Sequence, residues 1–411
     1  MRVLVPNLGS TSLKVQLLDM ADETVIARGR VESIASERSR MSFSRGNGEA
    51  TEDVAAVADH RSAVEWLLSR LGELEHGPED AIEAVGLKTV HGGPGFTDSH
   101  VVTDEVLEAM QDFVTVAPAH NAIYVEAIEI LRDALPGTPM VAVFETGFHR
   151  TIPEQAHLYG VPYEWSEAYG VRRYGFHGSS HRFVSQRVPE LLGRSPRGFR
   201  LVSCHLGGSS SLCAVRDGES VDTSFGFSPQ SGVEQGTRCG DLDPFVVFHL
   251  MERTGKTADE VAQLLCSQSG LLGISGLTGD LRELEEAAAA GHARAALAID
   301  VYVHGIRKQI GAFAAVLGGL DALAFAGGIG ENSWRIREHV CDGLGFLGVE
   351  LDLARNRRPG SGDAVVSTPG RPVAVVVVRT NEELVVARET VRVLAGDRRL
   401  LTRASLKEGS T

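Results

Sequence analysis

The chain has 411 residues, too many for one ordinary hydrophobic core, so we expect two domains. Hydrophobic residues make up 43% of it and charged residues 23%, which is typical of a globular chain and not of a disordered one. The formal net charge of −14 repels a phosphate backbone, so we expect no nucleic-acid partner, and an anionic small molecule would need basic residues gathered locally.

Two similar hairpins are the first elements that the pattern predicts. Apolar residues 3–5 lead through a Gly/Ser turn into a second apolar run at residues 13–18. The same plan returns half a chain later, where residues 201–205 lead through another Gly/Ser turn into residues 212–215. A matched pair at this separation predicts a duplicated architecture.

Strands and helices alternate through the rest of the chain. Runs typical of buried strands lie at residues 81–90, 140–144, 322–326 and 373–378. Helical patterns cover residues 103–113, 121–135, 180–192, 284–317 (broken near Gly291) and 382–394. This alternation predicts an α/β protein with mixed sheets.

No low-complexity linker marks a domain boundary. We place the division near residue 150, with an N-terminal domain of residues 1–150 that a C-terminal helix at about 383–396 completes. The second domain then covers residues 151–382. Residues 34–52 are polar and rich in Gly, Ser and Arg, so we expect a surface excursion there. Residues 397–411 have little to bury, and we expect a disordered tail.

The five cysteines are scattered, without any CxxC spacing. This pattern predicts reduced thiols and argues against a zinc site or a disulfide framework. The sequence has no long apolar helix, signal peptide or lipidation motif. We therefore expect a soluble, cytoplasmic protein with no membrane partner.

Two early segments are richer in polar residues than a core needs. The turn from Asn7 to Lys14 offers backbone N–H groups and a lysine, which suits a phosphate or a metal-bound phosphate. It does not match the P-loop pattern, and an ordinary hairpin turn explains it equally well. The second segment, Lys88 to His91 with His120 further on, carries histidines that could as easily be structural.

Glu145 ends an apolar strand, where open α/β sheets present ligand groups. Its carboxylate could hold Mg²⁺, orient a nucleophile or cap a helix. Further on, Arg172, Arg173, His177 and His181 fall within ten residues, more polar than a core strand tolerates without partners. The two histidines have helical i,i+4 spacing, but without a third ligand an anion contact is favoured over zinc.

Two later segments contain glycines beside polar residues. Arg238 stands between Gly236 and Gly240, close to two aspartates, which suits either a buried ion pair or a ligand that approaches the backbone. The run GGIGEN at residues 327–332 follows a strand, as a nucleotide-binding turn would, although it is not the GxGxxG fingerprint.

Together and in this order, these segments resemble the acetate kinase family from Asn7 to about Arg388. The most specific matches are HGG at His91, YGFHGSSH at 174–181, VDTSFGFSP at 221–229, GTRCGDLDP at 236–244, SGLLGISG at 269–276, GGIGEN at 327–332 and TNEEL at 380–384. That family belongs to a superfamily with sugar kinases, Hsp70 and actin. The resemblance therefore implies an α/β fold of two duplicated actin-like (ribonuclease H-like) ATPase domains, each a mixed sheet flanked by helices.

The resemblance also implies an activity: reversible, Mg²⁺-dependent phosphoryl transfer from ATP to acetate or another short-chain carboxylic acid, giving an acyl phosphate and ADP. Mn²⁺ is an alternative ion, and a homodimer through the second domain is implied. Catalytic roles fall to Glu145, His177 and Arg238, and metal contacts to Asn7 and Glu382. The acyl pocket would comprise Lys88, Val90, Ala119, Phe176 and Pro229. ATP would be held by Lys14, His205, Leu206, Gly207, Gly208, Ser209, Asp280, Leu281, Arg282, Gly328, Ile329, Gly330, Glu331 and Asn332.

Several of these positions depart from the family pattern. Lys88 stands where the family has arginine, which replaces a planar fork with a point charge. Glu145 replaces the aspartate of FDT, Gly208 and Ser209 replace the last two residues of HLGNG, and Ala119 replaces the leucine of APLHN. The smaller Ala119 would enlarge the acyl pocket.

Three interpretations are compatible with these departures. The site has co-adjusted and the enzyme works on acetate or a longer acid, or pyrophosphate or orthophosphate replaces the nucleotide, or the chain is a weakly catalytic nucleotide-binding regulator. Because Asn7, His177, Arg238 and Glu382 are all retained, the sequence favours a working kinase.

Overall fold

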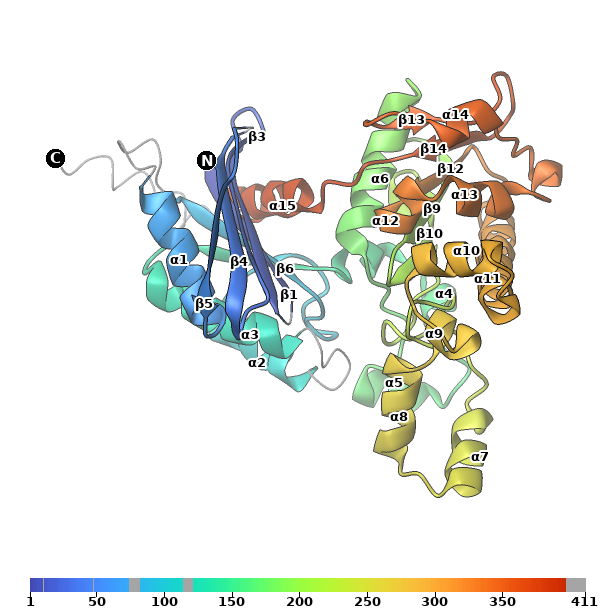
Figure 1. The fold of residues 1–411 in the computed structure, drawn as a ribbon, viewed down its shortest axis with the longest axis horizontal. Helices are drawn as coiled ribbons and strands as arrows, with labels where there is room; N and C mark the ends of the chain where they lie inside the picture. Colours follow the sequence, from blue (N-terminus) through green and yellow to red (C-terminus); the bar gives the residue numbers. More distant parts are fainter. Residues whose placement is uncertain (10, 47, 74–81, 114–120, 397–411) are drawn as a thin grey trace. The chain divides into compact units, whose positions relative to one another are not determined.

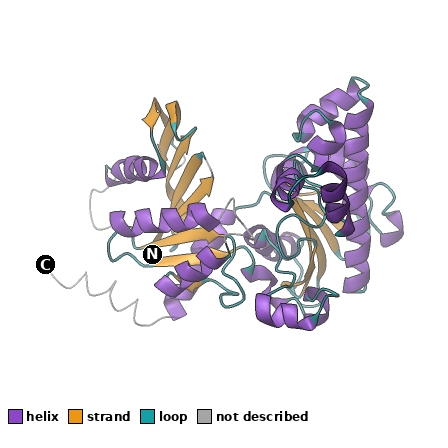
Figure 2. Ribbon diagram, turned by 90° about the horizontal axis from the view of Figure 1, so that it is seen from below, coloured by secondary structure: helices purple, strands orange, loops and turns teal. Residues whose placement is uncertain are grey.

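The computed structural model of the chain describes residues 1–9, 11–46, 48–73, 82–113 and 121–396. These residues form two compact units, Met1–Gly147 with the described part of Asn381–Thr411, and Phe148–Thr380. Each unit is a β-sheet with helices packed on it (Figure 2). In the described part of the chain, no helix combines the length and the apolar character needed to cross a membrane.

The sheet of the first unit has the spatial order β5-β4-β3-β2-β1-β6-β8-β7. β1 pairs with β2 in antiparallel and with β6 in parallel orientation, so the sheet is mixed. The strands are β1 (Arg2–Gly9), β2 (Ser12–Asp19), β3 (Thr24–Glu32), β4 (Ser36–Arg45), β5 (Thr51–Val57), β6 (Ala84–Thr89), β7 (His100–Val101) and β8 (Met140–Phe144).

Side chains alternate between the two faces of this sheet. Leu4 packs with α1 (His60–Gly72), α2 (Asp104–Asp112) and α3 (Asn121–Ala134) on one face. Val3 and Val5 pack with α15 (Glu382–Gly396) on the other. Figure 1 shows α15 on the opposite side of the sheet from α1. The last helix therefore completes the first unit after the chain has built the second.

The sheet of the second unit has the order β11-β10-β9-β12-β14-β13. Helix α6 covers one face, and α10, α11 and α13 cover the other. The strands are β9 (Arg200–Leu206), β10 (Ser210–Arg216), β11 (Glu219–Thr223), β12 (Ala322–Ala326), β13 (Ala364–Val365) and β14 (Ala374–Val377). The helices are η2 (Gly147–Thr151), which begins at the unit boundary, α4 (Glu154–His157), α5 (Tyr163–Tyr169), α6 (Gly178–Leu191), α7 (Phe245–Thr254), α8 (Ala258–Ser267), α9 (Gly270–Ser275), α10 (Leu281–Ala289), α11 (Ala293–Leu317), α12 (Gly327–Asn332), α13 (Trp334–Cys341), η3 (Gly345–Leu347) and α14 (Leu353–Arg357).

The two sheets repeat one strand order. Five strands have the order β3-β2-β1-β6-β8 in the first unit and β11-β10-β9-β12-β14 in the second. In each set the first three strands pair in antiparallel orientation, and the last two continue the sheet in parallel orientation. The central parallel pairs are β1 with β6 and β9 with β12. The predicted fold class, duplicated mixed sheets flanked by helices, is confirmed.

Residues 34–52 do not form the surface excursion that their composition predicts. They contain β4 and the start of β5, which pair in antiparallel orientation at the edge of the first sheet. Ser39, Met41 and Phe43 are buried, while Arg38 and Arg40 between them are exposed. This period of two marks a strand with one buried face, a signal that the polar composition hides.

Candidate active site

In the first unit, the predicted site residues lie near the ends of β1, β6 and β8. Glu145 directly follows β8, and its backbone N–H donates to the carbonyl of Thr89 at 2.9 Å, at the end of β6. Lys88 lies on β6 and Asn7 on β1. Since these three strands are parallel, their carboxyl ends share one edge of the sheet, where such folds present ligand groups.

Lys88 pairs with a residue from the far end of the chain. Its ammonium forms an ion pair with Glu382, the first residue of α15. Burial by itself lowers the pKa of Lys88, but the negative charges of Glu382 and Glu145 outweigh it and raise the pKa above its usual value. Lys88 is therefore a fixed positive charge in the physiological range, held between two carboxylates.

Oxygen ligands gather beside this ion pair. The Asn7 Nδ2 group donates to Glu383 Oε1 at 3.3 Å, so the start of α15 brings two carboxylates, those of Glu382 and Glu383, toward β1. Among the described residues, no three His, Cys, Asp or Glu side chains form a closed metal cage. Mg²⁺ keeps several water ligands and is often held by one or two carboxylates. The amide and carboxylate oxygens present fit such an ion.

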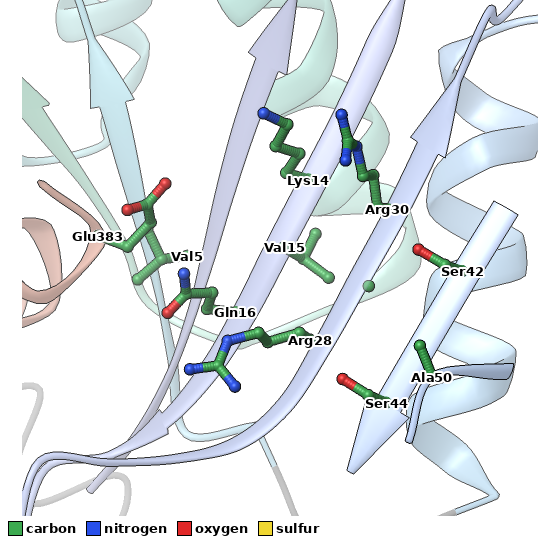
Figure 3. A pocket seen from close by; sticks show the side chains of 11 residues that line it. Val5, Lys14, Val15, Gln16, Arg28, Arg30, Ser42, Ser44, Ala50 and Glu383 are labelled. Carbon is green, nitrogen blue, oxygen red and sulfur yellow. The ribbon is translucent and has the colours of Figure 1, made fainter. Parts of the chain in front are cut away.

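Lys14 lies on β2, directly opposite Asn7 on β1 and Arg30 on β3. It lines a pocket of about 290 Å³ on the face formed by β2, β3 and β4 (Figure 3). Arg30 pairs with Glu32, and Arg28 donates to the carbonyl of Gly46 at 2.9 Å. No hydrogen bond or ion pair engages the Lys14 side chain within the described ranges. Its ammonium is thus available to an anion.

In the second unit, His177 has a constrained position just before α6. Its backbone is left-handed, with a φ of 56°, which is uncommon outside glycine. Its Nδ1 lies 2.8 Å from the hydroxyl of Ser211, and its ring lies 4.1 Å from that of His205. His205 Nδ1 in turn lies 2.7 Å from Ser180 Oγ. The rings of the predicted catalytic histidine and of a predicted ATP contact are therefore in contact at a tilt of 31°, and a serine hydroxyl lies within hydrogen-bond distance of each.

Arg238 is anchored through one nitrogen. Its Nη1 donates to Ser209 Oγ at 3.1 Å, to Gln235 Oε1 at 3.3 Å and to the carbonyl of Pro229 at 3.4 Å. Burial lowers the pKa of Arg238, yet a guanidinium keeps its charge in proteins. In the part of the chain that the structure describes, Nε and Nη2 have no hydrogen-bond partner. The guanidinium is held at one end and can offer its other donors to an anion.

Three predicted ATP-binding segments and the loop of the predicted catalytic Arg238 meet through close backbone contacts. Gly236 N–H donates to the carbonyl of Gly208 at 3.0 Å. A Cβ added at Gly279 would lie 2.6 Å from the carbonyl oxygen of Gly236, and one at Gly327 would lie 2.7 Å from that of Leu206. The β9–β10 turn, the loop of Arg238, the start of α10 and the start of α12 therefore lie together.

The remaining predicted ATP contacts lie in or next to α10 and α12. Asp280 caps α10 by accepting from Arg282 N–H at 2.8 Å, and the Arg282 side chain is the main cause that lowers its pKa to about 2. Leu281 is buried in the core. Glu331 and Asn332 accept from Arg379 Nη1 at 3.2 and 3.0 Å, and Gly328, Ile329 and Gly330 precede them in α12.

The predicted acyl-pocket residues fall in both units. Val90 is half-buried after β6, and Phe176 and Pro229 are buried in the second unit. Ala119 lies outside the described residues, as do Ser10 of the first turn and residues 397–411.

Comparison with known proteins identifies the family. The model of the acetokinase family matches residues 2–388. The chain belongs to the acetokinase family. It is 47% identical to the acetate kinase of Geobacillus sp. (strain WCH70) over 394 residues, which cover 95% of this chain and 98% of the relative. As a family member it is a phosphotransferase with a carboxyl group as acceptor.

Solved structures of acetokinase relatives share the fold. The crystal structure of Porphyromonas gingivalis acetate kinase has a TM-score of 0.86 and 40% identity, covering 96% of this chain and 99% of its own. A propionate kinase from Francisella tularensis has a TM-score of 0.88 and 34% identity, covering 95% and 99%.

Two residues of the segment predicted to contact an anion, Arg173 and His181, hydrogen-bond to other groups of the protein. Arg173 donates through Nη1 to the carbonyls of Thr223, Ser224 and Phe225, so it holds the backbone of the second unit. His181 is fully buried, and both of its ring nitrogens face serine hydroxyls.

Sequence reasoning also missed Gln235 and Ser211. Gln235 is fully buried and links Ser209, Arg238 and Pro229, and Ser211 links His177 to His181. Both stand one to three residues from a predicted site residue, but neither residue type signals that role by itself.

Proposed function

We propose that this protein catalyses the reversible transfer of the γ-phosphoryl group of ATP to acetate or another short-chain carboxylic acid. The observation that carries the proposal is the anchored Arg238, with donors to spare, in the same unit as His177 and the glycine-built nucleotide segments. The names of the relatives, acetate kinases and a propionate kinase, support the same reaction.

The chemistry needs positioning and charge neutralisation more than covalent catalysis. A carboxylate is already a nucleophile, so no general base is needed. One of its oxygens forms a bond to the γ-phosphorus while the bond from that phosphorus to the bridging oxygen of ADP breaks, and ADP leaves with the electron pair. We assign to Arg238 and His177 the neutralisation of charge on the phosphoryl oxygens.

In the first unit, we assign substrate and metal roles to the cluster at the strand ends. Lys88 attracts the carboxylate of the acid, and the nearby carboxylate of Glu145 orients the ammonium group of Lys88. Mg²⁺, or Mn²⁺ in its place, would be held by the oxygens of Asn7 and Glu382. When bound, the metal neutralises part of the charge of the nucleotide phosphates. Lys14 adds a positive charge opposite Asn7.

The preferred acid is proposed from the pocket residues. Val90, Phe176 and Pro229 are apolar, and Ala119 is smaller than the family's leucine, so propionate or butyrate gains relative to acetate. An added methylene contributes only about 1–3 kcal/mol to discrimination. The name of the Francisella tularensis relative supports testing propionate first.

The activity test is ATP consumption by the purified protein with Mg²⁺ and acetate, propionate, butyrate or no acid, with hydroxylamine to trap the acyl phosphate. Acid-dependent hydroxamate is the expected result, and the acid with the highest kcat/KM reports the pocket size. ATP binding without hydroxamate from any acid would overturn the proposal.

The second unit carries an apolar surface that supports a homodimer. Phe245 and Phe248 on α7 are 76% and 62% exposed, with rings 6.0 Å apart, and Leu242 lies nearby in sequence. No residue of α7 is buried, although most of the helix is apolar. Exposed apolar patches of this kind mark protein interfaces. A second copy of the chain is the partner that we propose.

Light scattering after size-exclusion chromatography tests this dimer. We expect the mass of two chains for the natural protein and of one chain for Phe245→Asp combined with Phe248→Asp. Val54→Asp, which also adds a charge at an exposed apolar residue (59%) but in the first unit, should stay dimeric. A natural protein with the mass of one chain would contradict the proposal.

A cytoplasmic location is also proposed. All five cysteines, Cys204, Cys213, Cys239, Cys266 and Cys341, are free thiols. Unpaired thiols are typical of a reducing compartment.

A further inference from the structure

Behind His177 lies a continuous chain of buried polar groups. Its Nδ1 lies 2.8 Å from Ser211 Oγ on β10, and that oxygen lies 2.9 Å from Nε2 of His181 on α6. The other ring nitrogen of His181, Nδ1, lies 2.9 Å from Ser203 Oγ on β9. Ser203, Ser211 and His181 are all fully buried.

The protons in this chain can be arranged in only two ways. Among the described residues, the Ser211 hydroxyl has hydrogen-bond partners only in these two imidazoles, so its single proton goes to one of them and its oxygen accepts from the other. Burial lowers the pKa of His181 well below its usual value, so its ring is neutral and has a single N–H. The hydrogen bonds therefore run either from Ser203 toward His177 or from His177 toward Ser203.

The burial of Ser203 decides between the two directions. Within the described ranges, the only partner of its hydroxyl is His181 Nδ1. If the bonds ran toward Ser203, its own O–H proton would be buried without an acceptor, which is unfavourable. If they run from Ser203, every proton in the chain has an acceptor: Ser203 donates to His181 Nδ1, His181 Nε2–H donates to Ser211, and Ser211 donates to His177 Nδ1.

We propose that Ser203, His181 and Ser211 are positioning residues that hold His177 as the tautomer protonated on Nε2. This inference rests on the proposed role of His177 in phosphoryl transfer. With Nδ1 occupied as an acceptor, the ring N–H of His177 is on Nε2, and in the proposed reaction we assign this N–H to a phosphoryl oxygen. The same bonds fix the plane of the ring, so the donor is aligned before the substrates bind.

Neutron diffraction from deuterated crystals of the full chain reads the tautomer directly, without reference to activity. We expect deuterium on Nε2 of His177, on Nε2 of His181, and on the Ser203 hydroxyl pointing to His181. Deuterium on Nδ1 of His177 would overturn the inference. If the natural protein forms no hydroxamate, the proposed function fails while the neutron map still decides the tautomer.

Kinetics of variants test the consequence. By analogy with the outer-shell partners of metal-bound histidines, Ser211→Ala should lower kcat about tenfold with little change in KM for ATP. Ser211→Thr keeps the hydroxyl and should recover most of the rate. Ser185→Ala removes another buried hydroxyl from α6, whose only hydrogen-bond partner among the described residues is the carbonyl of Arg182, and should leave kcat unchanged. A natural kcat in Ser211→Ala would overturn the inference.

Discussion

The two units share a strand order but hold their functional side chains by opposite means. In the first unit, Lys88 is a charged group placed between the carboxylates of Glu382 and Glu145. In the second, His177 belongs to a network of histidines and serines, and Arg238 is anchored by neutral oxygens. One scaffold therefore supports both a charge-compensated cluster and a hydrogen-bonded network.

The ion-paired cluster and the hydrogen-bonded network respond differently when one member is removed. Removing one member of a buried ion pair leaves an uncompensated charge, which destabilises the fold. Removing one member of a neutral network mainly loosens the orientation of its neighbours. We therefore expect substitutions in the first unit to change stability together with activity, and substitutions in the second to change activity more than stability.

The largest expected effect is in the second unit, for Arg238→Ala. This change removes a positioned charge donor, which typically costs about 3–4 kcal/mol of transition-state stabilisation, so kcat should fall roughly 10²- to 10³-fold. The hydroxamate assay measures it, and thermal unfolding should change little. Arg197→Ala, at an exposed arginine of the same unit, is the control. A rate near that of the natural protein would remove Arg238 from the mechanism.

In the first unit, Lys88→Met should act on stability. It leaves Glu382 and Glu145 without their cation, and because the pair is partly exposed we expect a loss of about 1–3 kcal/mol in the free energy of unfolding. The side chains of Lys88 and Glu382 are 22% and 16% exposed. Urea unfolding measures the loss, and Lys256→Met, at an exposed lysine, is the control.

The pH dependence of that loss has a definite sign. The pKa of Lys88 is raised in the folded chain. The contribution of the Lys88 charge to the free energy of unfolding is therefore complete below the unfolded pKa of 10.5, and it is lost only as the pH rises through the folded pKa. The difference between Lys88→Met and the natural protein should therefore stay constant from about pH 6 to pH 9. A difference that disappeared within this range would show that Lys88 is not the charged partner.

A double-mutant cycle tests whether Lys88 and Glu145 are adjusted to each other. Lys88→Arg and Glu145→Asp each restore the family's residue at one position only. Each should lower kcat/KM by about tenfold, and the double variant should recover most of it, because residues of one charge network couple by roughly 0.5–3 kcal/mol. Losses that simply add would mean that the two departures arose independently.

The smallest effect is expected for Ser209→Gly in the second unit, which restores the family's glycine. It removes the hydroxyl that donates to Gln235 at 2.8 Å and accepts from Arg238 at 3.1 Å. A hydrogen bond contributes about 0.5–1.5 kcal/mol net, so kcat should fall about threefold. An unchanged kcat would mean that Gln235 and Pro229 suffice to hold Arg238.

Local sequence patterns determined much of the secondary structure of this protein. The two hairpins, the strands at β8 and β12, and the long helical segment of α10 and α11 follow from apolar periodicity and glycine-rich turns. The motifs around His177 and Arg238 identified the family, because their order along the chain is specific. Composition gave a wrong prediction at β4, where polar side chains occupy the exposed face of the strand, and elements such as β3 and α1 were not predicted.

Only the tertiary structure decided which side chains meet. Lys88 and Glu382 are 294 residues apart, and their pairing exists because α15 returns to pack against β1, β6 and β8. Gln235 and Ser211 gained their roles from the strand order, which places β9, β10 and α6 around His177. Side-chain partners of this kind depend on non-local contacts, and local periodicity, which reports only which face of an element is buried, carries no information about them.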